Sequence, residues 1–255
     1  AHGGGLSALL AAYEAGGFFS PVDKYHSTAF ENFADAAGAR GLSLTAPAPG
    51  DTFSLGEAQV TILGPVEDYD DANDTSIVLR VDFDETAFLF TGDMEREAEA
   101  DLLDSGAELW ATVLKVGHHG SSTSTSYPFL REVLPACAVI SCGTDNSYGH
   151  PHEETLSRLY DAGCTVYRTD LLGTVVAVSD GKEVAFTTRE EGRPAAGRED
   201  GTPPEAEAVY IGNQNSQIFH LETCPNLPKE ENRILFTSRQ EALDAGYTPC
   251  SNCNP

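Results

Sequence analysis

The chain has 255 residues, of which 40 are acidic and 15 basic, giving a formal charge of −25. A hydrophobic content of 40% is enough for one sizeable core with a small appendage, and no apolar run approaches the roughly 18 residues of a transmembrane helix. The dispersed acidic residues disfavour a broad surface for nucleic-acid phosphates. Three explanations of the acidic charge stay open: a salt-rich environment, a nucleic-acid contact confined to a metal-loaded cleft, or a solvated surface that has no role in the mechanism.

The first 85 residues predict two helices and three strands. Thr28 to Ala39 should be a helix capped by Ser27 or Thr28, because serine and threonine accept hydrogen bonds from the first helical turn. The other expected elements are a helix over 7–15 and strands over 42–45, 58–63 and 76–82.

A buried strand from Thr86 to Thr91 should end at an acidic side chain. Gly92 lets the backbone turn sharply, so Asp93 should emerge at the end of the strand. The segment from Met94 to Gly106, rich in Ala, Leu and Glu, predicts a helix closed by its glycine.

The next strand, Trp110 to Val116, leads into two histidines and then into small residues. His118 and His119 are adjacent, so in an extended strand their side chains point to opposite faces. At most one should then bind a metal directly, unless the backbone turns there. A carboxylate and an imidazole at the same end of neighbouring strands are plausible ligands for zinc, manganese or iron.

A third strand, Cys137 to Cys142, is followed by a loop with two more histidines. His150 precedes a proline and should be held extended, which makes it the better candidate for the cleft, as a metal ligand or as the acid that protonates a leaving oxygen. His152 should lie at the surface, at the start of a helix over 153–162. Three strand ends thus predict a shared site containing Asp93, His118, His119 and His150.

The remaining strands, over 164–169, 173–178 and 183–188, are expected to complete the sheet, the last two joined by a hairpin turn at Asp180–Gly181. Residues 189–208 are rich in Gly, Pro, Glu and Arg and predict a flexible linker. Cys137, Cys142 and Cys164 lie in apolar runs without metal-binding spacing and should be buried free thiols.

The last 47 residues, 209–255, predict a separate zinc-binding module. His220 and Cys224 form a His-x3-Cys pair, and Cys250 and Cys253 a Cys-x2-Cys pair, which fits a closed tetrahedral zinc site in a segment too short to hold itself together by burial alone. The alternative, a disulfide within the module, would leave an odd cysteine and a stranded histidine.

Three blocks resemble one known family. FLFTGD, LKVGHHGSSTS and VISCGTDNSYGHPHEETLSRLYDAG are similar to the metallo-β-lactamase-fold domain of the ComEC competence proteins, over residues 2–188. The resemblance implies an α/β fold with an αββα sandwich and a metal-dependent hydrolase. It also implies zinc or manganese in the cleft, bound by His2, Asp93 and His118, with Asp93, His118, His119 and His150 as catalytic residues. ComEC proteins are thought to degrade one DNA strand during uptake, and other branches cleave phosphodiesters.

The chain departs from the family pattern at two places. His2 matches the last histidine of a His-x-His/Asp-x-Asp-His motif, but Ala1 stands where the motif has Asp, either because the aspartate is replaced or because the sequence starts inside the motif. We therefore expect the first strands of the family fold to be missing and the activity to be weak or absent. Asn73 stands near a family histidine, and its amide should at most weaken a second metal site or contact substrate; an ordinary turn asparagine is as good an interpretation.

The C-terminal module resembles the zinc-binding N-terminal module of the Ada DNA-repair protein, which implies structural zinc on His220, Cys224, Cys250 and Cys253. Two functions remain open: a hydrolase acting on DNA or another phosphodiester, or an inactive binding or structural fragment whose zinc module contacts nucleic acid or protein. The resemblance implies a bacterial surface or extracellular location, and the sequence does not indicate an oligomeric state.

Overall fold

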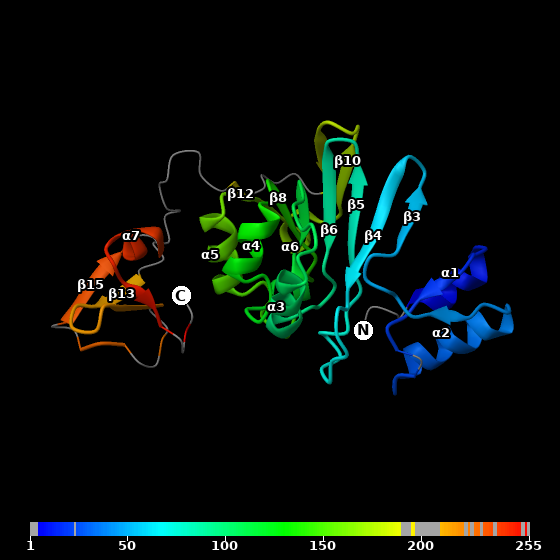
Figure 1. Cartoon of the computed structure of the whole chain (residues 1–255), viewed down its shortest axis with the longest axis horizontal. Helices are drawn as coiled ribbons and strands as arrows, with labels where there is room; N and C mark the ends of the chain where they lie inside the picture. The colour runs from blue at the N-terminus through cyan, green and yellow to red at the C-terminus, as the bar shows by residue number, and fades with distance from the viewer. Residues whose placement is uncertain are drawn as a thin grey trace.

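A computed structural model describes residues 5–22, 24–189, 195–196, 210–221, 224, 227–229, 232–236, 239–250 and 253. The predicted α/β class is confirmed: a large mixed sheet with helices packed against it forms the centre, and a small four-stranded unit lies at the C-terminus (Figure 1). Within the described residues, no helix has the length and apolar character needed to span a membrane.

The central sheet has eight strands in the order β12-β9-β8-β7-β6-β5-β4-β3. Neighbours from β3 to β6 are antiparallel, whereas β6, β7, β8 and β9 are parallel to one another. The strands are β3 (Thr52–Leu55), β4 (Ala58–Gly64), β5 (Val78–Phe83), β6 (Thr86–Phe90), β7 (Val113–Lys115), β8 (Cys137–Ile140), β9 (Thr165–Arg168) and β12 (Ala195–Ala196).

The parallel half of the sheet is built from strand–helix–strand crossovers, because parallel neighbours need a long connection. The connecting helices are α3 (Arg96–Asp104), α4 (Tyr127–Val133) and α5 (Glu153–Asp161). Figure 1 shows them gathered beside this half of the sheet. The main core lies between these layers and contains fully buried Leu89, Leu114 and Ile140 from three successive strands.

The N-terminal helices pack against each other in a core of their own, around Leu10, Phe33 and Ala37. They are α1 (Leu6–Ala12) and α2 (Thr28–Ala39), accompanied by the short parallel pair β1 (Phe18–Phe19) and β2 (Leu44–Thr45). Ser27 caps α2 as predicted, since its hydroxyl accepts a hydrogen bond from Phe30 N at 3.2 Å.

Two features differ from the sequence-based expectation. Strands β10 (Val175–Ser179) and β11 (Val184–Thr188) form the predicted hairpin, but among the described residues they pair only with each other and do not extend the central sheet. The place beside β9 is taken by β12, which lies inside the predicted linker and pairs antiparallel with Thr165 and Val166. The short helix α6 (Thr169–Leu172) follows β9 directly and leads the chain away from the sheet.

The C-terminal unit is a four-stranded sheet in the order β15-β13-β14-β16 with helix α7. Its elements are β13 (Tyr210–Asn213), β14 (Ile218–Leu221), β15 (Arg233–Phe236), α7 (Arg239–Asp244) and β16 (Thr248–Pro249). Tyr210 and Arg239 contact the larger unit: the Tyr210 hydroxyl lies 2.6 Å from Ser157 Oγ, and the Arg239 guanidinium lies over the Tyr127 ring at 3.9 Å.

Candidate metal sites

The ends of three neighbouring parallel strands converge on one edge of the central sheet. Phe90 of β6 pairs with Lys115 of β7, which pairs with Val139 of β8, so the three strands end in register. Asp93 and His118 each follow the paired residue of their strand by three positions. The predicted juxtaposition at a shared edge therefore follows directly from the strand order.

Gly92 is the turn that brings Asp93 into the site. Its φ is +57°, and a Cβ atom there would lie 2.7 Å from Ser76 Cβ, so only glycine fits without a shift. The same serine holds the next residue, because the backbone N–H of Asp93 donates to Ser76 Oγ at 2.9 Å.

The two adjacent histidines do not continue the strand. They lie in a 3₁₀ turn, Gly117–Gly120, with left-handed φ values of 45° for His118 and 56° for His119. The backbone thus turns here, and both rings lie near the acidic side chains at the end of β6 instead of on opposite faces of the sheet. The ring centroids are 6.4 Å apart. Left-handed conformations at two consecutive non-glycine residues cost free energy, and such strained backbone is found most often at functional sites.

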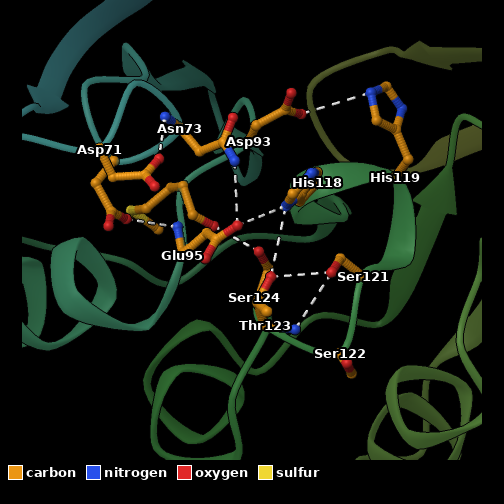
Figure 2. Close-up of polar contacts among 12 residues, drawn as sticks. Asp71, Asn73, Asp93, Glu95, His118, His119, Ser121, Ser122, Thr123 and Ser124 are labelled. Carbon is orange, nitrogen blue, oxygen red and sulfur yellow. Dashed lines mark hydrogen bonds and ion pairs between the residues drawn. The ribbon is translucent and has the colours of Figure 1, made fainter. Parts of the chain in front are cut away.

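Each histidine faces its own carboxylate (Figure 2). His119 Nε2 lies 3.5 Å from Asp93 Oδ1, and His118 Nδ1 lies 3.0 Å from Glu95 Oε1. His119 Nδ1 lies 2.6 Å from the carbonyl oxygen of Ser141, which can only accept. Nδ1 therefore donates to the carbonyl oxygen, and Nε2 is the ring nitrogen that faces Asp93.

Glu95 is a site residue that the sequence analysis missed. Besides facing His118, its carboxylate accepts a hydrogen bond from Asn73 Nδ2 at 3.1 Å, and its backbone N–H donates to Asp74 Oδ1 at 2.8 Å. Asn73 therefore contacts an acidic site residue from within a turn. A second acid two positions after Asp93 was the available sequence signal.

His150 joins this group from the loop after β8. Its ring centroid lies 5.5 Å from that of His118 and 6.4 Å from that of His119. Burial lowers the pKa of His150, and the nearby His152, His118 and His119 lower it further. The neutral form of the ring, which can accept a proton or bind a metal, is therefore favoured.

His152 lies at the start of α5, as predicted, but its ring also holds two loops together. Ser122 N donates to His152 Nδ1 at 2.9 Å, so Nε2 carries the proton and faces the carbonyl oxygen of Tyr148 at 3.3 Å. The loop after the two histidines is thereby tied to the loop that carries His150. His2, a predicted ligand, lies outside the described residues.

The C-terminal unit gathers all four predicted zinc ligands. The ligand atoms of His220, Cys224, Cys250 and Cys253 all lie within 4.8 Å of one another. Burial lowers the pKa of His220, which favours the neutral ring that binds metals. Burial and the neighbouring Cys224 and Cys250 raise the pKa of Cys253 to about 12. A cation bound among these sulfur atoms would stabilise their thiolate forms and offset the repulsion between the negative charges.

Comparison with known proteins matches each of the two units to a family. Residues 2–144 match the family model described as "Metallo-beta-lactamase superfamily", which covers more than half of the chain. The chain belongs to the metallo-beta-lactamase superfamily. Residues 202–255 match the "Metal binding domain of Ada". This match and the cluster of one histidine and three cysteines together indicate a structural zinc site.

Curated relatives of the chain include two proteins named for competence and one named for recombination. The chain is 35% identical over 146 residues to ComE operon protein 3 of Bacillus subtilis, covering 57% of this chain and 19% of that protein. It is 43% identical over 106 residues to competence protein ComA of Neisseria gonorrhoeae, covering 41% of this chain and 15% of that protein. Recombination protein 2 of Haemophilus influenzae is 30% identical over 177 residues, 68% of this chain and 20% of that protein. The chain thus spans a fifth or less of these relatives.

The side chains at the strand ends suit the metal that the superfamily name implies. Asp93 offers a carboxylate, and His119 offers Nε2 while its Nδ1 is held by a carbonyl oxygen, the arrangement that orients metal-binding histidines in proteins. Among the residues that the structure describes, only the C-terminal cluster brings three or more ligand atoms this close together. At the strand ends the potential ligands lie in two pairs, His118 with Glu95 at 3.0 Å and His119 with Asp93 at 3.5 Å.

Proposed function

We propose that the chain is the metal-dependent hydrolase part of a competence protein and that it cleaves phosphodiesters, with DNA as the substrate. The observation that carries the proposal is the convergence of Asp93, His118, His119 and His150 at the ends of three parallel strands. Carboxylate and imidazole groups are the ligands of hydrolytic zinc and manganese sites.

In this proposal, Asp93 and His119 hold the metal, joined by His118, and zinc or manganese is the ion. The contacts favour His119 as a ligand as strongly as His118, because the Ser141 carbonyl fixes its orientation. When bound, such an ion polarises a phosphoryl oxygen and makes a water molecule acidic enough to ionise near neutral pH.

The residues around the ligands have separate roles. Glu95 accepts a hydrogen bond from His118 Nδ1 and so directs the other nitrogen of that ring away from the acid. His150, next to both histidines, is placed to exchange a proton with the attacking water or with the leaving oxygen.

DNA as substrate, and action at the bacterial surface, rest on the relatives. The three relatives named above are competence and recombination proteins, and the chain matches a fifth or less of each. A charge of −25 leaves little affinity for the phosphates of a long duplex, which favours a single strand entering a local site.

The test is metal-dependent cleavage by the longest natural polypeptide that contains this sequence. Bis-p-nitrophenyl phosphate and single-stranded DNA should both be cleaved with added manganese or zinc. An Asp93→Ala change should abolish cleavage, whereas Asp104→Ala, an exposed aspartate in α3, should leave it unchanged. Cleavage by the Asp93→Ala variant at the wild-type rate would contradict the proposal.

A non-catalytic function is the second candidate, favoured by one observation. Among the described residues, the C-terminal cluster is the one group of three or more potential ligands whose atoms all lie within 4.8 Å of one another. The strand-end residues do not form such a group. A binding fragment with an inert cleft would hold one zinc ion per chain and cleave neither substrate. Metal content measured alongside the cleavage assay therefore separates the two functions.

A further inference from the structure

Tyr148 presents an open aromatic face beside the candidate site. Its side chain is 76% exposed, and its ring stacks on His150 with a centroid distance of 5.7 Å and an interplanar angle of 22°. His150 in turn lies nearly parallel to His119, at 6.4 Å and 19°. One side of the Tyr148 ring thus faces the histidines of the site, in the offset geometry that aromatic rings prefer.

The loop that carries Tyr148 is held in place on both sides of the tyrosine. Asn146 Nδ2 donates to the carbonyl oxygens of Gly143 and His150, and Asn146 Oδ1 accepts from His150 N at 2.9 Å. The ring of His152 joins the Tyr148 carbonyl to Ser122 N. The loop backbone on both sides of Tyr148 is therefore held relative to the site, so placing a ligand on the ring costs little ordering of the loop.

The charge of the chain makes such a ring useful for substrate binding. With 40 acidic and 15 basic residues, the protein cannot gain much affinity by neutralising phosphates. Stacking of a base on an aromatic ring needs no positive charge and tolerates any base. Because His150 covers the inner face of Tyr148, a base would stack on the outer face, one ring beyond His150 at the rim of the site.

We propose that Tyr148 is a binding residue for an unpaired nucleobase and that its stacking supplies substrate affinity for single-stranded DNA. This inference rests on the proposed function, because it names the substrate contact of the same site. It restricts that function to strands whose bases are exposed, since a base inside a duplex cannot offer its face to the ring.

Equilibrium binding tests the inference without using cleavage. In the Asp93→Ala background, fluorescence anisotropy of a labelled oligothymidylate is compared with that of an oligonucleotide of the same length whose sugars carry no bases. Tyr148→Ala should weaken oligothymidylate binding about 5- to 100-fold and leave the weak binding of the abasic strand unchanged. Tyr148→Phe should bind as the parent does, because the ring is kept. Tyr13→Ala, a change at a tyrosine 69% exposed elsewhere, is the matched control and should also have no effect.

Equal binding of oligothymidylate by the parent and by Tyr148→Ala would overturn the inference, as would equal binding of the normal and abasic strands by the parent. Cleavage of bis-p-nitrophenyl phosphate by the natural polypeptide is measured separately. Its absence would refute the proposed hydrolase function, while a binding difference at Tyr148 would still support base recognition.

Discussion

Glu95 joins two candidate site residues, since its carboxylate faces His118 Nδ1 at 3.0 Å and accepts from Asn73 at 3.1 Å. Partners of this kind orient metal ligands and commonly contribute 10- to 100-fold to metal affinity. The same reasoning applies to the Ser141 carbonyl behind His119. Orientation at this site is therefore set by groups that themselves follow strands β6 and β8.

The residue-scale prediction concerns Glu95→Ala. Removing the acceptor leaves the ring of His118 free to rotate, so manganese affinity at the strand-end site should fall about 10- to 100-fold. Isothermal titration calorimetry with manganese suits the measurement, because the thiolate-rich C-terminal cluster prefers zinc. Glu97→Ala, an exposed position on the following helix turn, is the control and should titrate as the wild type does. Unchanged affinity in Glu95→Ala would refute the orienting role.

Two buried charges hold the segment that follows the adjacent histidines. Glu99 of α3, 2% exposed, accepts hydrogen bonds from the backbone N–H groups of Thr125 and Ser126. Arg158 of α5, 3% exposed, donates to the carbonyl oxygens of Ser122 and Ser124 at 3.2 and 3.0 Å. Burial raises the pKa of Glu99, while the hydrogen bonds from Thr125 and Ser126 and the charge of Arg158 act in the opposite direction. Helices on both sides of the segment thus fix its backbone.

The element-scale prediction follows from this arrangement. Glu99→Ala leaves the backbone N–H groups of Thr125 and Ser126 without their acceptor, so the free energy of unfolding should fall by about 1–3 kcal/mol for each group. Urea denaturation measures the change. Glu97→Ala lies two positions away on the same helix, is exposed, and should shift the free energy by less than about 0.5 kcal/mol. Similar losses in both variants would contradict the clamping role of Glu99.

Local signals predicted the elements well and their partners less well. The bounds of α2 and the strand-end position of Asp93 follow from a cap and from a glycine turn, both of which depend on neighbouring residues. The contacts of Glu95 with His118 join positions 23 residues apart, and no local pattern encodes them. The same holds for the left-handed turn at His118 and His119, which forms against residues from other strands.

The hairpin of β10 and β11 shows the same limit. Asp180–Gly181 was predicted as its turn, and Gly181 has the left-handed φ of +92° that such turns need. Membership of the central sheet depends instead on which segment lies beside the edge strand β9. Two residues of the predicted linker, Ala195 and Ala196, occupy that edge. Strand pairing across a long sequence separation was therefore beyond the reach of local patterns.

The two units of the molecule touch through a small set of side chains. The Tyr210 hydroxyl lies 2.6 Å from Ser157 Oγ and 3.5 Å from Asp161 Oδ2, and Arg239 covers the ring of Tyr127. These partners lie on α4, which begins directly after the segment that follows the adjacent histidines, and on α5, which carries Arg158. Each unit nevertheless has its own core, so they should unfold separately.

The whole-molecule prediction uses the single tryptophan, Trp110, which lies in the larger unit and is 38% exposed. Cys250→Ser should release the structural zinc and unfold the C-terminal unit, because small metal-binding domains fold on their metal. Zinc content by mass spectrometry should drop by one ion per chain, while the melting curve of Trp110 fluorescence changes little. Cys137→Ser, outside the cluster, should retain the ion. Full zinc content in Cys250→Ser would contradict the assignment of this cluster.

Anomalous X-ray diffraction from crystals grown with manganese or zinc tests the central claim most directly. The account predicts a metal peak at the strand ends, about 2.0–2.2 Å from a carboxylate oxygen of Asp93 and from Nε2 of His119. In the zinc crystals a second peak should lie among His220, Cys224, Cys250 and Cys253. A zinc peak at the C-terminal cluster alone, with no metal beside Asp93 in either crystal, would contradict the hydrolase function.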